Sequence, residues 1–516
     1  MPFVAHGSMR CFFCWAGEVR HVGRTRRRMM VTSTSETLVE ERTILGHPRA
    51  IMNLAGLGIW ERFSFFGTQI ILMYYLYFSV SDGGLGLATS TAISLTATFG
   101  ALVYCATVIG AWVSDRLLGP ERTLFYSIFT IMFGHLALAV LPGMLGLAVG
   151  LSLLVVGTGG SVSNLPSSVG LLYKDKDPRR DAGFILLYTG LNVGALAGPL
   201  LTGLVRSHLG FHFGFGLAAV GLAFGLALYA PGRKRIGPVG RVAPNPLPRD
   251  SVASVAAAVV LCISVFAAAT ALGIVTLDNL AFIVTVIVAL TSVSYFVIML
   301  RSPKTNTAER RRVRALIPLF IAVAVFFALY HQQFTVVQVY AAERVNLDAF
   351  GFPIPPEFFN SVIPAFVIVV GPAYAALWTS LGSRQPSSPV KFLIGLLVIV
   401  LAFLLFLPTA ASHGAVIAPI TLIGILLVFT LSELFVAPVQ LSLATEIAPT
   451  AFRTQTVSLM YLSIALGSSG GGIIAKSYDP ATEFNYFLTV ALGALVVAAV
   501  YALTIPWTKR MLNADS

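Results

Sequence analysis

The chain has 516 residues, of which 56% are apolar and only 11% are charged, and its mean hydropathy is +0.84. Soluble globular proteins carry about a quarter of their residues as charged side chains. The formal net charge of +12 comes from lysines and arginines that are clustered between long apolar stretches. This composition excludes a soluble enzyme, a nucleic-acid-binding protein and a secreted domain, and it predicts an all-α polytopic membrane protein.

Apolar stretches long enough to cross a bilayer as helices recur along the whole chain. A spanning helix needs about 20 apolar residues, and the stretches 123–173 and 392–432 are each long enough for two helices. About 14 transmembrane helices are therefore predicted, at about 50–81, 88–114, 121–141, 144–173, 182–206, 211–231, 251–276, 279–300, 315–341, 358–382, 389–408, 415–447, 454–476 and 484–508.

The distribution of basic residues predicts the orientation in the membrane. Only three of the 34 lysines and arginines, Arg206, Arg344 and Lys476, fall in one set of alternate loops, and Arg62 falls inside a span. The others lie in the opposite loops and at the two ends. Because cytoplasmic loops are enriched in Lys and Arg, we expect both termini in the cytoplasm. We interpret the basic runs as topology signals, with no nucleic-acid partner.

The predicted helices divide into two sets of six with two further helices between them. Two six-helix halves around a mid-membrane cavity are common among secondary transporters. The expected segments are a disordered cytoplasmic extension at 1–49 (with Met30 as an alternative start), a first half at 50–232, a basic cytoplasmic loop at 233–250, two extra helices at 251–300, a second such loop at 301–314, a second half at 315–508 and a cytoplasmic tail at 509–516.

The loop after the second predicted helix carries an acid and several bases in a tight turn. It reads Gly110-Ala-Trp-Val-Ser-Asp115-Arg116-Leu-Leu-Gly119-Pro-Glu-Arg122, which resembles the GxxxDRxxGRR signature of the major facilitator superfamily. Such groups can pair across neighbouring helix ends. An ordinary charged loop is the alternative, but the position between helices two and three favours the signature.

Four further stretches resemble motifs of the proton-dependent oligopeptide transporter (POT/PTR) family. The segment Trp60-Glu-Arg-Phe-Ser-Phe-Phe-Gly67, preceded by Gly46-His-Pro48, is similar to that family's ExxERFxYYG. The others are Gly157 to Gly194, Phe326-Phe-Ala-Leu-Tyr-His-Gln332 beside FWxxFEQ, and Ser432 to Pro449. The resemblance covers about residues 46–508. It implies the major facilitator fold and proton-coupled import of di- or tripeptides.

The resemblance also implies which residues form the transport site. The ionisable residues in mid-span are Glu61, Arg62, His331 and Glu433, and a charge within the bilayer is costly unless it is paired or hydrated. The implied proton-coupling residues are Glu61, His331 and Glu433. The implied substrate-binding residues are Arg62, Phe65, Phe66, Gln69, Tyr104, Asn192, Phe327, Gln332 and Glu433.

Several positions depart from the family pattern. The first motif acid falls at Gly58, and the helix-four lysine falls at Val162. The family's gate ion pair between helices one and seven is replaced by Gln69 and His331, an amide and an imidazole that can still form a hydrogen bond. The departures leave the acidic end of the implied pocket intact and remove most of its basic end. A purely structural role for His331, or for the pair of Glu61 and Arg62, remains an alternative.

We therefore expect a secondary transporter that imports di-/tripeptides or peptide-like solutes with protons across the cell membrane. Alternatives are a transporter of a neutral, cationic or drug-like solute with altered or absent proton coupling, and a transporter-like receptor. No paired carboxylates or metal-ligand groups occur in the spans. We therefore expect no enzyme, no cofactor and no bound metal, and we expect a monomer in the lipid bilayer whose partners are its peptide-like substrate and protons.

Overall fold

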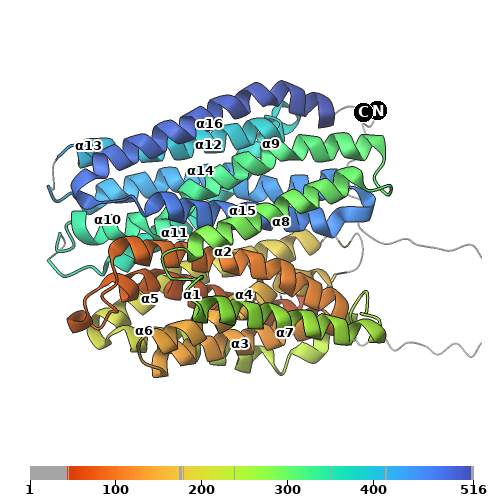
Figure 1. The fold of residues 1–516 in the computed structure, drawn as a ribbon, viewed down its shortest axis with the longest axis horizontal. Coiled ribbons are helices and arrows are strands. Elements are labelled where there is room, and N and C mark those ends of the chain that lie inside the picture. Colours follow the sequence, from red (N-terminus) through yellow and green to blue (C-terminus); the bar gives the residue numbers. More distant parts are fainter. Residues whose placement is uncertain are drawn as a thin grey trace, which may run out of the picture.

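The computed structural model describes residues 43–44, 46–173, 177, 179–236, 239–349, 351–412 and 415–512. Two short antiparallel strands, β1 (Thr43–Ile44) and β2 (His47–Pro48), precede a series of helices. The helices, drawn in Figure 1, are α1 (Arg49–Tyr77), α2 (Thr89–Val113), α3 (Pro120–Val140), α4 (Gly143–Gly170), α5 (Arg180–Leu209), α6 (Phe211–Tyr229), α7 (Arg249–Ala271), α8 (Leu280–Arg301), α9 (Thr307–Tyr330), α10 (Val336–Arg344), α11 (Val362–Leu381), α12 (Ser388–Leu404), α13 (Leu407–Ala410), α14 (Pro419–Ile447), α15 (Arg453–Ala475) and α16 (Glu483–Leu512). The expectations for residues 1–42, including Met30, and for 513–516 fall outside the described residues.

The helices have the length and hydropathy of membrane spans. Among the described residues, 13 helical segments are long and apolar enough to cross a bilayer. In addition, α1 extends over 29 residues but contains Glu61, Arg62 and Gln69, which lower its hydropathy. The predicted all-α polytopic architecture is thus confirmed.

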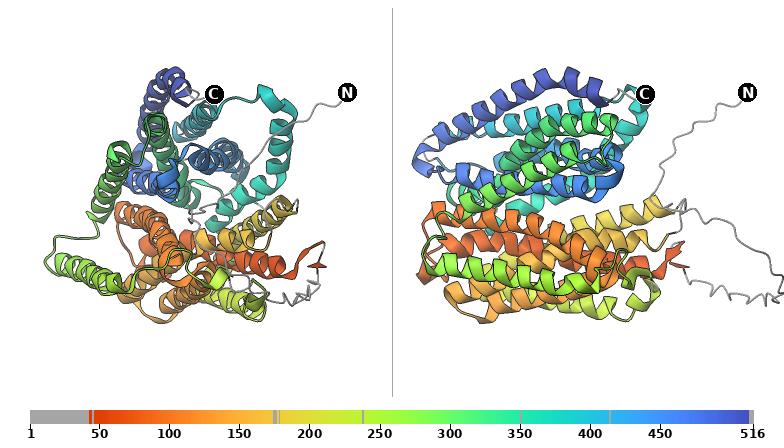
Figure 2. Two further views of the ribbon diagram at one scale, coloured as in Figure 1. Left: turned by 90° about the vertical axis from the view of Figure 1, so that its right-hand side faces the viewer. Right: turned by 45° about the vertical axis from the view of Figure 1, so that its right-hand side comes forward.

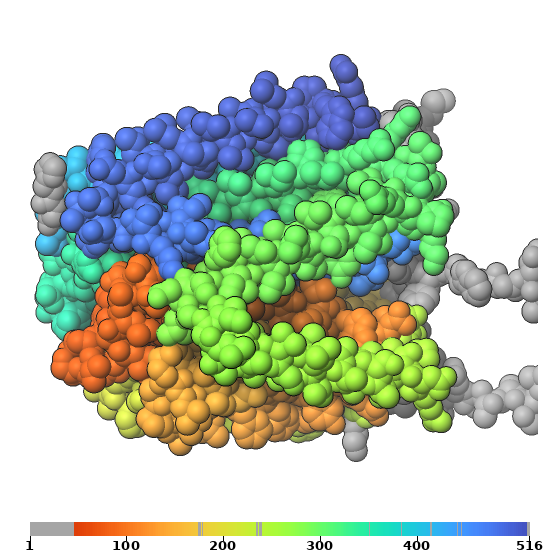
Figure 3. Space-filling model, viewed as in Figure 1, coloured from red at the N-terminus to blue at the C-terminus, as the bar shows by residue number. Residues whose placement is uncertain are grey.

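The spans form two bundles. Helices α1–α6 gather in one bundle and α9–α16 in the other, as the view along the helix axes in Figure 2 shows. The strands before α1 and the end of α16 lie at the same end of the molecule. Helix α8 packs against α2 of the first bundle and α15 of the second, and the segment of α7 and α8 lies across the junction on the face seen in Figure 3. No side chain of α7 is buried, as expected for a helix that faces lipid.

Small residues allow the helices within a bundle to approach closely. A Cβ atom at Gly110 of α2 would lie 2.5 Å from the carbonyl oxygen of Gly159 of α4, and one at Gly67 of α1 would lie 2.7 Å from Cγ2 of Thr202 of α5. Glycine at such positions lets two helix backbones come together. The motif glycines at the end of helix two and in helix four therefore have a direct packing role.

The helix that the sequence predicts as continuous at 315–341 is broken in the structure. Helix α9 ends at Tyr330, a 3₁₀ turn η5 (His331–Phe334) follows, and α10 begins at Val336. Side chains stabilise the break, because the Gln338 amide donates to the Gln333 carbonyl at 2.6 Å and Gln332 Oε1 accepts a hydrogen bond from Tyr486 at 2.7 Å. No glycine or proline marks this interruption in the sequence.

The basic loop after α6 folds back onto the first bundle. Glu121 at the start of α3 is fully buried and forms ion pairs with Arg233 at 2.6 Å and Arg241 at 3.3 Å. Asn245 donates its side-chain amide to Asp115 Oδ1 at 2.8 Å and its backbone N–H to the Asp115 carbonyl. The signature motif after α2 and the loop after α6 are thereby joined, which gives these bases a structural role besides any topological one.

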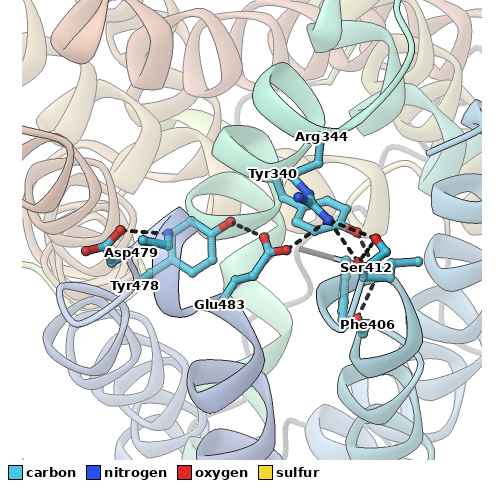
Figure 4. A network of polar contacts seen from close by, with 9 residues as sticks. Tyr340, Arg344, Phe406, Ser412, Tyr478, Asp479 and Glu483 are labelled. Carbon is cyan, nitrogen blue, oxygen red and sulfur yellow. Dashed lines mark hydrogen bonds and ion pairs between the residues drawn. The ribbon is translucent and has the colours of Figure 1, made fainter. Parts of the chain in front are cut away.

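At the opposite end, Arg344 lies in a buried polar network within the second bundle. Its guanidinium approaches Glu483 of α16 at 3.1 Å and donates to the carbonyl of Thr409 at 2.8 Å. Tyr478 donates to the other oxygen of Glu483 at 3.5 Å. Figure 4 shows this network bridging α10, α16 and the segment near α13. These contacts join the end of α10 to the last helix, α16.

Candidate functional site

A cavity of about 300 Å³ lies between the two bundles. The first bundle contributes side chains of α1, α2 and α5, and the second contributes side chains of α9, η5, α11, α14 and α15 together with the 3₁₀ turn η6 (Pro356–Ser361). Its lining consists of Arg62, Phe65, Phe66, Gln69, Gly100, Tyr104, Tyr188, Leu191, Asn192, Ala195, Phe327, Tyr330, His331, Gln333, Phe334, Asn360, Ile363, Pro364, Val367, Glu433, Ala437, Gln440, Tyr461 and Ile464.

One face of α1 forms a wall of this cavity, and the chemical character of its side chains changes along the helix. Arg62, Phe65, Phe66 and Gln69 all line it, and their spacing places them on a single helical face. The Arg62 guanidinium lies 5.8 Å from the centre of the Phe65 ring, within the range of a cation–π contact. The wall therefore changes from a cation to aromatic rings and then to an amide along the helix.

Glu61, next to Arg62, does not line the cavity. Its side chain is 1% exposed, it accepts a hydrogen bond from Ser161 of α4 at 2.9 Å, and it lies 3.3 Å from Arg62 Nε. The carboxylate is thus enclosed between α1 and α4 and is linked to the cavity through Arg62.

The opposite wall carries a carboxylate held by a tyrosine. Glu433 lies in the middle of α14, and the Tyr330 hydroxyl donates to its Oε2 at 2.5 Å. Tyr188 and Asn192 of α5 also line the cavity, and Asn192 donates its amide to the Tyr188 carbonyl at 2.9 Å. Arg62 and Glu433 therefore give the cavity one cationic and one anionic group on different bundles.

His331 packs among aromatic rings in the turn η5, between α9 and α10. Its ring is stacked on Tyr104 at 5.6 Å between centres and tilted against Phe327 at 5.2 Å. Gln69 and His331 both line the cavity, but the described residues include no hydrogen bond between them. In this conformation the imidazole stacks on Tyr104, and a hydrogen bond between Gln69 and His331 stays a prediction for other conformations.

Gln332, a predicted substrate-binding residue, does not line the cavity in this conformation. Its amide oxygen accepts the Tyr486 hydroxyl at 2.7 Å and its amide nitrogen donates to the Ala328 carbonyl at 3.4 Å. In the turn η5 the neighbouring residues His331 and Gln333 line the cavity, so Gln332 between them points toward α16. In this conformation Gln332 stabilises the helix break, and its contact with a substrate stays a prediction.

The cavity is closed at one end by contacts between the bundles. Arg206 at the end of α5 makes a two-bond ion pair with Glu357 of η6, at 2.7 and 2.6 Å. Ser361 donates to the Leu196 carbonyl at 2.8 Å, and Tyr74 donates to the Gln338 side chain at 2.9 Å. A second hollow of about 220 Å³ shares Tyr461 with the cavity and is lined by α2, α4 and α15. The positive-inside rule predicts that this end is the outer one.

The sequence model of the POT family (PTR2) matches residues 121–490. The chain belongs to the POT family. It is 38% identical to the uncharacterized transporter YclF of Bacillus subtilis over 477 residues, covering 92% of this chain and 97% of that one. It is 34% identical to a di-/tripeptide transporter of Lactococcus lactis subsp. cremoris, covering 89% and 95%. A crystal structure of a peptide transporter POT with sulfate aligns with a TM-score of 0.88 at 40% identity, covering 91% of this chain and 97% of that chain.

The two main departures from the POT family pattern have different surroundings. A Cβ atom at Gly58 would lie 3.0 Å from Leu191 Cδ2 and 3.2 Å from Leu165 Cδ2, so leucines fill the space of the missing acid. Val162 lines the second hollow rather than the main cavity. Neither position therefore lines the main cavity of this POT family member.

Several lining residues escaped the sequence interpretation. Tyr330 is adjacent to His331 in the helix-seven motif, and Gln440 follows Glu433 by seven residues, or two helical turns. Their neighbours in the motifs are the signal that could have identified them. Tyr188, Gln333, Asn360 and Tyr461 belong to the same group. Gln333 and Asn360 lie in the turns η5 and η6, which the sequence does not predict, whereas Tyr188 and Tyr461 lie in the predicted helices α5 and α15.

Proposed function

We propose that this POT family protein transports di-/tripeptides or peptide-like solutes into the cell by alternating access, coupled to protons. The observation that carries the proposal is the cavity between the two bundles, with Glu433 on one side, Arg62 on the other and aromatic rings between them. The relatives named as di-/tripeptide transporters and peptide transporters support the cargo class. The chain is a membrane transporter by family; the cell membrane, cytoplasmic termini and monomeric state are part of the proposal.

The cargo would be held chiefly by its amino group. A carboxylate in a cavity of low dielectric attracts an ammonium more strongly than it does in water, and Tyr330 orients Glu433 toward this role. Arg62 would receive the carboxylate, but its guanidinium is already within 3.3 Å of Glu61. Phe65, Phe66 and Phe327 would contact the apolar parts, while Gln69, Tyr104 and Asn192 supply polar edges.

Proton coupling would use the three titratable groups around this cavity. Glu61 can release Arg62 when it is protonated, and Glu433 can release the cargo amine in the same way. His331 is the third candidate, because imidazole is the side chain whose ordinary pKa lies between pH 5 and 8. The Arg206–Glu357 contact would close the outer side while cargo leaves on the inner side.

Equilibrium competition with purified protein tests the cargo assignment. Trialanine and dialanine should displace a fluorescent dipeptide, whereas free alanine and an organic cation such as tetraethylammonium should not. Displacement by the cation but by neither peptide would contradict the proposal. It would favour a non-peptide cargo held by Glu433 and the aromatic wall.

A further inference from the structure

Buried amide groups without partners are concentrated on the wall of the cavity. Among the described residues, the buried Asn and Gln side-chain atoms that lack a hydrogen-bond partner are Gln69 Oε1, Gln333 Nε2, Asn360 Nδ2, Asn360 Oδ1 and Gln440 Oε1. All four residues line the cavity, and each is at most 3% exposed. A buried polar group without a partner is unfavourable, so its repeated occurrence at one place needs an explanation.

Asn360 is the clearest member of this set, because neither atom of its amide has a partner. It lies in η6, between Glu357 and Ser361, both of which contact α5. Asn192, which also lines the cavity, donates its amide within its own helix. Asn360 therefore presents a free donor and a free acceptor in a rigid part of the wall.

Gln69 supplies a further acceptor from the other bundle. It lies on α1, which contacts η6, and its Oε1 has no partner. It follows Arg62 by seven residues, which corresponds to a rise of about 10 Å along the helix. Gln69 and Asn360 thus lie toward the closed end, beyond the level at which Arg62 lines the cavity.

The surroundings of these amides are apolar. Phe66 and Phe334 lie 6.1 Å apart between ring centres, and Ile363, one turn after Asn360, lines the same wall. A hydrogen-bonding site in such a setting strongly rejects a ligand that lacks the matching polar group, because the site's own groups then stay unpaired.

We infer that Gln69 and Asn360 form a subsite for a neutral amide carried by a side chain of the cargo. A primary amide has both an acceptor and a donor, and so matches Asn360 Nδ2 together with Asn360 Oδ1 and Gln69 Oε1. This inference rests on the proposed peptide transport. It adds a preference for peptides that contain asparagine or glutamine, and it places their side chain at the closed end of the cavity.

The test compares matched peptides for competition against a fluorescent dipeptide. Ala-Gln and Gln-Ala are compared with Ala-Met and Met-Ala, because methionine has nearly the shape of glutamine without its amide. In the unaltered protein, the better glutamine peptide should bind about tenfold more tightly than its methionine counterpart. Asn360→Leu should reduce this ratio to near one, and Gln455→Leu, an amide in neither hollow, should leave it unchanged.

Thermal unfolding separates this role from a structural one. Because Asn360→Leu removes unpaired polar atoms, it should leave the melting temperature unchanged or raised. If Asn360→Leu does not yield folded protein, Gln69→Met provides the same ratio test from the other bundle. Equal affinities for the glutamine and methionine peptides in the unaltered protein would overturn the inference while leaving peptide transport intact. If none of the peptides binds, both the inference and the proposed function fail.

Discussion

Tyr330 donates a hydrogen bond of 2.5 Å to Glu433, and the two residues come from α9 and α14 within the same bundle. The bond holds one carboxylate oxygen and leaves the other available to a ligand. It also places the Glu433 carboxylate beside the end of α9, where the turn η5 begins at His331. The anionic group of the cavity is therefore held by the residue that directly precedes the candidate gate residue His331 in the chain.

Replacing Glu433 should change which chemical group of the cargo is recognised. In the unaltered protein, N-acetylated dipeptides should compete poorly and dipeptide amides almost as well as the free acids. The reason is that Glu433 has one carboxylate oxygen outside its bond with Tyr330, whereas Arg62 is engaged by Glu61. Glu433→Gln should remove the discrimination against N-acetylated ligands, measured as competition for equilibrium binding of a fluorescent dipeptide. Tyr330→Phe should weaken it only in part. If amidation costs more affinity than acetylation, Arg62 dominates recognition.

Breaking the Arg206–Glu357 pair should shift the protein toward an outward-open state. Both side chains are largely buried, with exposures of 13% and 0%, so Glu357→Gln strands the arginine, at a cost of about 3–5 kcal/mol when one partner of a buried pair is removed. A cysteine placed at Phe334, in a background without native cysteines, should then react faster with a membrane-impermeant thiol reagent added outside.

The matched control for the Arg206–Glu357 ion pair is Glu483→Gln. The Arg344–Glu483 pair is equally buried but lies within one bundle. Its loss should lower the melting temperature without increasing labelling at position 334. Equal labelling in both variants would show that Arg206–Glu357 is not a gate.

His331 should contribute to the pH dependence of uptake. Replacement by glutamine keeps a polar side chain of similar size but removes the imidazole, which is the group that can take up a proton. His331→Gln should still permit exchange of peptides and should flatten the pH profile of uptake. His135→Gln is the control, because His135 is buried away from the cavity and bonded to Thr68 at 3.1 Å. An unchanged profile in His331→Gln would remove this residue from the mechanism.

Restoring the family acid at position 58 should not restore a family-like site. Glu at Gly58 would meet Leu165, Leu187 and Leu191 within about 3.4 Å of its Cβ atom. Arg62, one helical turn away, is already paired with Glu61, and burial of a further carboxylate among leucines is unfavourable. Gly58→Glu should reduce the melting temperature by several degrees and lower uptake. Gly58→Ala, which adds only the Cβ, should be much milder. A Gly58→Glu variant with normal stability and increased uptake would contradict this packing argument.

The sequence was sufficient to predict those parts of the protein that follow from hydropathy and from local motifs. The spans, the bundle arrangement and the α1 face from Arg62 to Gln69 depend on helical periodicity, which the sequence shows directly. The break at η5 has no glycine or proline signal and is stabilised by distant partners such as Tyr486. Asn360 and the displacement of Gln332 from the cavity depend on such turns, so they required the structure.

The central claim is proton-driven transport of peptides through this cavity, and uptake into proteoliposomes tests it most directly. Labelled dialanine should accumulate against its gradient when the outside is acidic and the inside negative, and the accumulation should disappear when an ionophore collapses the proton gradient. Glu433→Gln should abolish accumulation. Uptake that is the same with and without the gradient would contradict proton coupling, and no uptake of any peptide would contradict the proposed function itself.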